Sequence, residues 1–583
     1  MMKLIGPNEA RGLSGVEGLR GALVCLTLVL CSAAYSFRFM SFLHAKEAVF
    51  CLCVCGIAIT VAVQGRIPRR GFAAFAPLWL YLALATFSIV FLPVKVPSDA
   101  LVQVVYWSLA LFATALCFDL VASGADGPVW RERVLDALVL STVTVATLGL
   151  VQYANICPTL FPLFQQYTQR VYSVFGNQDL YGGYLAIGIP VLVRRVLSGP
   201  APTSASARSP KPKTRNGILS LLGLVVLHPG LLVSGCRSAW LAAAIGILVC
   251  IPYRQLSQRG TRRLLGLAVG VTLATAWMAP QATVQRVAKL WAPDEQGLRV
   301  RLWMWDGTLR LIQDAPLFGV GLGNYGYWSP RYLGRSLQDA TGNGHVSSEL
   351  HADQPHSEPL RILAETGVVG LLCWGWFLVR LLRARNRGHH PDGVPLARAK
   401  GPLAAWVVFS LFNGPFDSIA HTFAFLLLAS MALRARDPEP DSTSRLFAWS
   451  APAIAAAVTG FVIWTMLIPS YLLRGAEDAH LAGRQNRSLN FALYEQVIAY
   501  PWPNATAHRD YGIALADAGR NAEAYRELLQ ALEGLDTGDV YLALAILAAK
   551  NGDHESAHRW AIECLLRWPA NKEARQLAGA NRP

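Results

Sequence analysis

The chain has 583 residues, of which 53% are hydrophobic and only 15% are charged. Soluble domains carry about 25% charged residues, so this composition predicts a membrane protein and excludes an ordinary soluble enzyme. The formal net charge of +15 does not indicate nucleic-acid binding, because basic cytoplasmic loops give a membrane protein the same excess.

Apolar segments long enough to cross a bilayer recur from residue 20 to residue 470. A hydrocarbon core of about 30 Å needs about 20 apolar residues of helix, and on this measure we predict about 13 spans. The predicted fold class is therefore all-α and polytopic, with a membrane domain over residues 1–470. The predicted spans are 20–36, 47–64, 71–92, 101–123, 133–154, 180–197, 217–234, 237–253, 263–280, 359–383, 402–418, 420–434 and 446–470.

The charges of the connecting loops predict a topology. If the N-terminus is cytoplasmic, every second loop is basic, as the positive-inside rule requires. We therefore expect the long polar segment 280–359 and the C-terminus to lie outside the cytoplasm. The basic loops are 64–70, 130–133, 194–215, 254–263 and 380–400, and residues 199–216 form a Pro/Ser/Lys-rich flexible cytoplasmic linker by composition.

From about residue 474 the composition changes, and charged residues become frequent. Gly519 and Gly552 lie 33 residues apart, as do Ala524 and Ala557. Such a period is close to the 34 residues of the tetratricopeptide repeat, which the stretch from Tyr511 to Ala531 resembles. We predict a tetratricopeptide-like domain over 474–583, with two to three helical hairpins that bind peptides or partner proteins; an unrelated helical bundle is the alternative.

The segment 280–359 is the one long polar stretch within the apolar first part of the chain. It contains an amphipathic run, Leu302–Ile312, and the alternating glycines Gly319, Gly321 and Gly323. Glycines permit positive φ and close backbone approach. Because a lone run of alternating glycines is weak evidence for a phosphate cradle, we interpret them as a tight structural turn.

Four stretches resemble motifs of one known family. They are Ser173-Val-Phe-Gly-Asn177 with its continuation to Tyr184, Ser234-Gly-Cys-Arg237-Ser-Ala-Trp240, the segment from Arg299 to Asn324, and His356-Ser357 followed after nine residues by Gly367-Val-Val-Gly370. Taken in this order, over roughly residues 130–435, they resemble the O-antigen ligase and polymerase superfamily. The resemblance implies a GT-C-like membrane fold and an inverting transfer of glycan from a polyprenyl-diphosphate carrier such as undecaprenyl diphosphate. It implies no metal and no cofactor.

Three residues are predicted to carry the chemistry. Arg237 and Arg301 suit an anionic diphosphate, because guanidinium groups offer planar, forked donors that stay charged. His356 is placed by its motif to take the proton of the acceptor hydroxyl, and an ordinary imidazole pKa of about 6.5 suits that role. The alternatives are arginines that snorkel to the membrane interface and a loop histidine without a function.

Further residues are predicted to contact substrate, namely Arg299, Asn177, Glu365, Asn324 and Ser357. An acid such as Glu365 is costly within a span unless it is paired, so it either pairs with an arginine or lies near the site. Asn413, Asp417 and His421 are polar groups at or near membrane depth. Such groups tend to be functional or mutually paired, and their positions alone do not decide between these.

No metal site is predicted. His351, Asp353 and His356 could ligate a metal, but their spacing is irregular and a proline intervenes. The 11 cysteines mostly lie in apolar segments without metal spacing, which indicates packing residues.

The sequence thus predicts an enzyme of the bacterial inner membrane, multi-pass, with its large loop and tail in the periplasm or outside the cell. It would transfer a glycan to an acceptor hydroxyl during cell-envelope polysaccharide synthesis. The acceptor stays open: a lipopolysaccharide core as in a ligase, a second lipid-linked chain as in a polymerase, or a protein hydroxyl as in an O-oligosaccharyltransferase. The alternatives of another class are a transporter of an anion or a lipid-linked substrate and an assembly scaffold.

Overall fold

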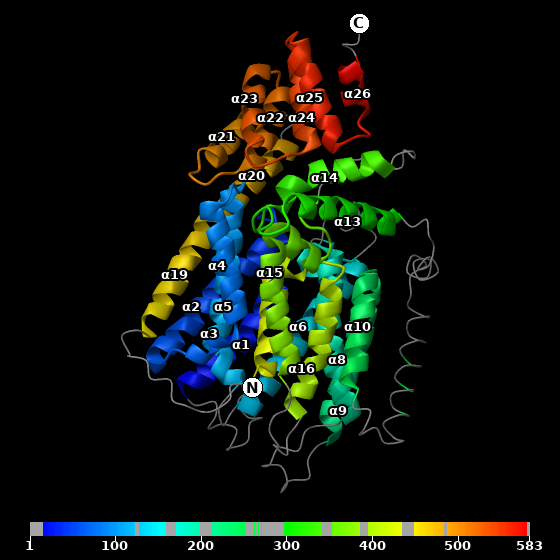
Figure 1. Ribbon diagram of the computed structural model, residues 1–583. Coiled ribbons are helices and arrows are strands. Elements are labelled where there is room, and N and C mark those ends of the chain that lie inside the picture. The colour runs from blue at the N-terminus through cyan, green and yellow to red at the C-terminus, as the bar shows by residue number, and fades with distance from the viewer. Residues whose placement is uncertain are drawn as a thin grey trace.

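The computed structural model is built of helices throughout its described part and contains no strand there. Figure 1 shows a bundle of long helices, capped at one end by two roughly transverse helices and a helical tail. The structure describes residues 15–122, 127–158, 171–198, 213–251, 296–340, 352–384, 394–433, 448–482 and 487–579, with the isolated positions 262, 266 and 270.

The chain is a polytopic membrane protein. Among the described residues, seven helices are long and apolar enough to cross a membrane, by length and composition, and four shorter apolar helices accompany them. The expected count of about 13 stays a prediction, because the expected span 263–280 falls mostly outside the described residues. The first part of the bundle comprises α1 (Val16–Ala33), α2 (Phe42–Gln64), α3 (Arg69–Ala74), α4 (Ala76–Phe91), α5 (Pro97–Ala122), α6 (Gly127–Tyr153), α8 (Gln178–Ser198), α9 (Lys213–Val233) and α10 (Arg237–Cys250).

The second part contains α15 (Glu358–Arg383), α16 (Val394–Ser410), α17 (Ile419–Ala432) and α19 (Ser450–Val462). Two expected spans are corrected here. The segment 71–92 is divided between α3 and α4, which meet at Phe75 just before a proline. The segment 402–418 stops being helical at Ser410, because Gly414 and Pro415 break it into a turn. That turn places Asn413 and Asp417 at the end of the bundle.

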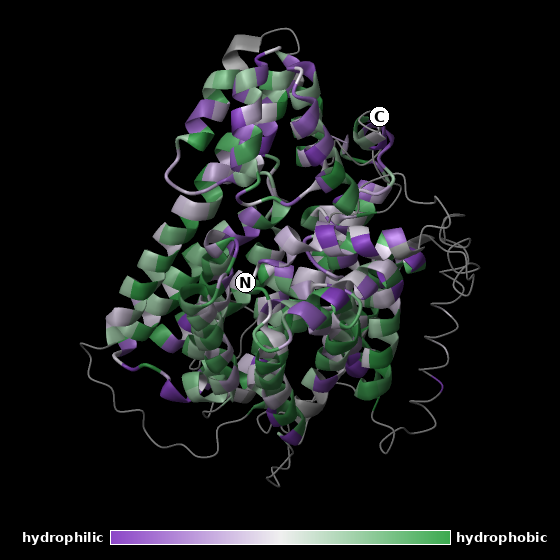
Figure 2. Ribbon diagram, turned by 45° about the horizontal axis from the view of Figure 1, so that its top comes forward, coloured by the Kyte–Doolittle hydropathy of each residue, from purple (hydrophilic) through white to green (hydrophobic). Residues whose placement is uncertain are grey.

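Aromatic residues fill the space between these helices. The ring of Trp406 stacks on that of Phe425 with 4.0 Å between the ring centroids, and the centroids of Phe416 and Trp107 are 4.4 Å apart. Figure 2 shows that hydrophobic residues dominate the bundle, whereas hydrophilic residues gather in the capping helices and the tail.

Helix α15 is broken at Gly367, which has φ 64° and ψ −167°. The glycine turn, which contains Gly319, Gly321 and Gly323, follows α13 (Gln296–Asp314). Its backbone amides donate to carbonyls of α15 that this break would otherwise leave without a partner. The amide of Val320 donates to Ala364 (3.0 Å), and the amide of Gly321 donates to Glu365 (2.9 Å). Gly319, Gly321 and Gly323 all have positive φ, so the predicted structural turn is confirmed.

The capping helices α13 and α14 (Tyr325–Ala340) lie across one end of the bundle (Figure 1). The indole Nε1 of Trp305 donates to the carbonyl of Pro355 at 3.0 Å, and the hydroxyls of Thr308 and Tyr325 are 2.8 Å apart. These contacts fix α13 against the loop before α15 and against α14.

The tail is an array of antiparallel helical hairpins. Helices α22 and α24 begin 33 residues apart, as do α23 and α25, which agrees with the predicted period. Helix α20 continues α19 through a π-helical segment and crosses the expected boundary at residue 474. The array comprises α20 (Ile468–Ala482), α21 (Arg487–Ile498), α22 (Ala505–Asp517), α23 (Asn521–Ala531), α24 (Gly538–Lys550), α25 (His554–Arg567) and α26 (Lys572–Gly579).

The tail also docks on the capping helix α14. The amide of Gln338 donates to the carbonyl of Leu565 at 3.1 Å. Gly334 faces the backbone of α25, where a Cβ would overlap the carbonyl oxygen of Leu566. The tail is therefore held by its continuity with α19 and by α14, and α20 also accepts the backbone amide of Met40 through Ser470 at 2.9 Å.

Candidate active site

The N-terminus of α8 contributes one carboxylate to the site. Asn177 precedes the helix, and its Oδ1 accepts the backbone amides of Asp179 (2.8 Å) and Leu180 (3.2 Å). An asparagine in this position satisfies the open donors of the first turn. Asn177 thus serves as the cap that starts α8, and Asp179 stands in its first turn.

The turn between α9 and α10 carries Arg237, which is half-buried. This turn lies close to α8 because Gly182 has no side chain: a Cβ there would be 2.8 Å from Oγ of Ser234 and 3.0 Å from Cβ of Cys236. The Sγ of Cys236 is 3.2 Å from Oγ of Ser238. Arg237 therefore begins α10 beside the first turn of α8.

Arg301 reaches this place from α13. Its Nη2 is 3.8 Å from Oδ2 of Asp179 and donates to Oδ1 of Asn413 at 3.5 Å. The Nδ2 of Asn413 in turn donates to Oγ of Ser238 at 2.5 Å. Four segments that are distant in the sequence are thus joined: α8, the α9–α10 turn, α13 and the α16–α17 turn.

His356 stands in the loop just before α15 with φ 49°, a conformation that costs energy in a residue other than glycine and is found at functional sites. Its Nδ1 is buried and has no hydrogen-bond partner in the described part of the chain. Burial lowers the pKa of His356, and the Arg301 charge lowers it further, while Asp179 and Asp417 oppose this. The imidazole is therefore neutral, and able to accept a proton, at neutral pH.

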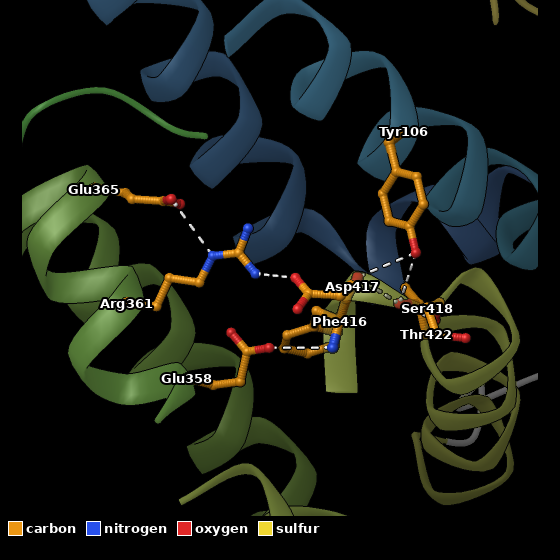
Figure 3. Close-up of polar contacts among 8 residues, drawn as sticks. All are labelled: Tyr106, Glu358, Arg361, Glu365, Phe416, Asp417, Ser418 and Thr422. Atoms are coloured by element: carbon orange, nitrogen blue, oxygen red, sulfur yellow. Dashed lines mark hydrogen bonds and ion pairs between the residues drawn. The ribbon is translucent and has the colours of Figure 1, made fainter. Parts of the chain in front are cut away.

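A network of charged side chains lies at the start of α15 (Figure 3). The sequence left open that Glu365 pairs with an arginine, but it did not predict the other members of this network. Arg361, in the second turn of α15, lies between Glu365, at 3.4 Å, and Asp417, which it contacts directly. Glu358 accepts the backbone amide of Phe416 at 3.1 Å. The network clamps the start of α15 to the α16–α17 turn. The signal for this network in the sequence was a charged residue within a predicted span, because such a residue is costly unless it is paired.

Two residues that were predicted to contact substrate have protein partners in this structure. The amide of Asn324 is buried, accepts from the backbone of Val96 (2.8 Å) and donates back to it (3.1 Å), so it ties the glycine turn to the start of α5. Glu365 is buried, pairs with Arg361 and accepts backbone amides of Gly323 and Tyr325. Both side chains are committed to protein partners in this structure.

The remaining predicted residues are placed as follows. Ser357 is buried at the start of α15 and makes no side-chain capping bond there. Arg299 is half-buried on α13, two residues before Arg301, so it projects from a different face of that helix. His421 is buried in α17, and its Nε2 is 3.0 Å from the carbonyl of Leu180, which makes it a packing link between α17 and α8.

No group of three metal-ligating side chains occurs among the described residues. His351, the predicted alternative ligand, lies outside them. The residues gathered at the site are arginines, a histidine, the carboxylate of Asp179 and hydrogen-bonding groups. The arginines suit an anionic substrate, and the histidine suits a proton transfer.

Residues 222–375 match the family model described as O-antigen ligase. The matched segment includes Arg237, the α13 helix, the glycine turn and His356 with the two glycines of α15. A search of the curated proteins finds no match to this chain. The chain is a multi-pass membrane protein that is similar to the O-antigen ligase family over residues 222–375, and this similarity supports a membrane glycan-transfer function of the ligase or polymerase type.

Proposed function

We propose that the protein transfers a glycan from a polyprenyl-diphosphate carrier to an acceptor hydroxyl at the outer face of the bacterial cytoplasmic membrane. The observation that carries this proposal is the convergence of Arg301, His356 and the Arg237 turn at one end of the bundle. Positive-inside loop charges support the outer side for that end. The donor would enter from the membrane, which its polyprenyl chain cannot leave.

The diphosphate is assigned to the arginines. Arg301 is 3.8 Å from Asp179, which is longer than the roughly 2.7–2.9 Å of a direct charge-assisted hydrogen bond. Its guanidinium therefore has donors to offer an incoming phosphate. Arg237, at the start of α10, adds a second guanidinium and stands where the helix dipole also favours an anion.

The proton of the acceptor hydroxyl is assigned to His356. Its neutral imidazole takes this proton as the hydroxyl oxygen attacks the anomeric carbon. The bond between that carbon and the diphosphate oxygen breaks, and the electron pair leaves with the diphosphate, where Arg237 and Arg301 balance the charge. Asp179 and Asp417 face the imidazole and stabilise it once it is protonated.

The tail stands over the end of the bundle that carries the site (Figure 1). This position favours an acceptor or partner that the hairpin array recruits to the site, and a protein is the occupant such arrays usually bind. A lipopolysaccharide core and a second lipid-linked chain are the other acceptors to be compared with it.

The test uses the full-length protein in lipid nanodiscs with a polyprenyl-diphosphate oligosaccharide and each of the three acceptor classes. Released polyprenyl diphosphate and glycosylated acceptor are measured. We expect release by the wild type and by Arg310→Ala, a control on the same helix that removes an exposed pair with Asp306. We expect no release of polyprenyl diphosphate from Arg237→Ala, Arg301→Ala or His356→Ala.

Equal release by all five proteins would reject the site assignment. Transport of the labelled donor across the bilayer of sealed proteoliposomes, without any release, would instead establish the transporter alternative. The acceptor that becomes glycosylated decides between ligase, polymerase and protein glycosylation.

A further inference from the structure

Asn413 occupies a position that neither the family resemblance nor the proposed chemistry assigns. It is 2% exposed and lies in the turn between α16 and α17. Its amide makes two hydrogen bonds of opposite sense: Nδ2 donates to Ser238 Oγ at 2.5 Å, and Oδ1 accepts from Arg301 Nη2 at 3.5 Å. One side chain therefore connects Arg301 with the residue that follows Arg237.

An amide suits both partners without adding charge. The guanidinium of Arg301 can only donate, so it needs an acceptor, and the Ser238 hydroxyl here accepts. A carboxylate at this position would still accept from Arg301 but could not donate to Ser238. It would also place a negative charge in a site that must bind a diphosphate.

The turn that holds Asn413 is fixed by three contacts from two helices, which Figure 3 shows at Phe416 and Asp417. Tyr106 of α5 donates its hydroxyl to the carbonyl of Phe416 at 3.1 Å, and Glu358 accepts the amide of the same residue. Arg361 holds Asp417. Because the turn is anchored to both α5 and α15, the amide of Asn413 serves as a fixed reference for Arg301 and, through Ser238, for the start of α10 that carries Arg237.

We propose that Asn413 is a positioning residue that sets the spacing of the two guanidinium groups for the two phosphates of one donor. This inference rests on the proposed function, because it concerns the donor half of that site. It predicts a defect in donor binding and in the departure of the diphosphate, with acceptor binding unchanged.

The test compares Asn413→Ala, Asn413→Asp and Ser238→Ala with the wild type in steady-state transfer, with donor and acceptor varied separately. A displacement of about 1 Å at a reacting group costs up to about 100-fold in rate, so we expect kcat/KM for the donor to fall roughly 10- to 100-fold in Asn413→Ala. Asn413→Asp should be at least as impaired. The KM for the acceptor should stay within about twofold of the wild-type value, a margin that reflects the precision of such assays.

The hydrogen bond itself is tested by a double-mutant cycle. If Asn413 acts through Ser238, the double variant Asn413→Ala/Ser238→Ala should be no worse than Asn413→Ala alone, because the second change removes a bond that is already lost. Ser430→Ala is the matched control, since the hydrogen bond that its hydroxyl makes in the described part of the chain stays within its own helix, to the carbonyl of Leu426. It should behave as the wild type.

Several results would overturn the inference. They are an unchanged donor kcat/KM in Asn413→Ala, a KM for the acceptor that rises as much as the KM for the donor, and fully additive effects of the two substitutions. If Asn413→Ala does not fold, Ser238→Ala alone decides, because it removes the same bond from the other side. Failure of the proposed function is recognised separately, by full release from His356→Ala and Arg301→Ala.

Discussion

Two arginines with largely buried side chains, one in the membrane bundle and one in the tail, form similar ion pairs but hold different parts of the protein in place. Arg361 has a side chain 12% exposed and holds Glu365 and Asp417; Arg567 is 3% exposed and holds Asp536 and Glu563. The partners of Arg567 lie within the α24–α25 hairpin and the loop before it. Those of Arg361 join α15 to a turn 56 residues away.

The difference lies in what each network positions. Around Arg567, the ring of Tyr541 packs against the guanidinium at 4.2 Å, and the network holds α25 to α24 and to the loop before α24. Around Arg361, the clamped segments carry His356 and Asn413. We therefore expect the loss of Arg567 to reduce mainly the stability of the tail, and the loss of Arg361 to reduce both stability and transfer.

The largest effect is expected for Arg361→Gln. Removing one partner of a buried ion pair costs about 3–5 kcal/mol, because charge is left unpaired, and misplacing His356 by about 1 Å costs about 100-fold in rate. Thermal unfolding measures the loss of stability, and release of polyprenyl diphosphate measures the loss of rate. Asp417→Asn added to Arg361→Gln should restore part of the stability without restoring the rate. If Arg361→Gln alone transferred glycan at the wild-type rate, Arg361 would not differ in role from Arg567.

Arg567→Gln should destabilise the tail by a similar amount, about 3–5 kcal/mol. Hydrogen exchange in α24 and α25 should accelerate, while exchange in α15 stays as in the wild type. Transfer to a soluble acceptor that does not depend on the tail should change less than about tenfold, or 1.4 kcal/mol. A loss of transfer as large as that of Arg361→Gln would show that the two networks do not differ in role.

Asp179→Asn tests the electrostatics of the site. Asp179 raises the pKa of His356 against burial and Arg301, which lower it from 6.5. Without the carboxylate the pKa falls further, so the imidazole stays neutral to lower pH. The acid limb of the kcat/KM profile, where activity is lost as the pH falls, should therefore move to lower pH. An acid limb that moves to higher pH would contradict the assignment of His356 as the base.

Gly334→Val should have the smallest effect on transfer. A side chain there overlaps the backbone of α25, so the tail should separate from α14 while staying attached through α19. Limited proteolysis should cut the tail faster than in the wild type. Gly475→Ala is the control, because a Cβ at Gly475 has no atom within 4 Å. Unchanged proteolysis would mean that α14 does not hold the tail.

The sequence predicted the helical membrane bundle and the helical hairpins of the tail because hydrophobic runs and a repeat period are local signals. It also named Arg237, Arg301 and His356, through motifs that the family resemblance brought together. Hydrogen bonds between distant segments left no such signal. Asn324 was expected to bind substrate, yet its partner Val96 lies 228 residues away. Likewise, Asn413 and Asp417 were recognised as polar groups, but only the fold shows which partners they have.

The central claim is that His356 takes the proton of the acceptor while the arginines hold the donor. Single-turnover transfer with saturating donor, together with donor binding, tests it most directly in His356→Ala. Because a positioned base contributes about 100- to 10,000-fold, we predict a single-turnover rate at least about 100-fold lower, with donor affinity as in the wild type. A wild-type single-turnover rate in His356→Ala would contradict the claim.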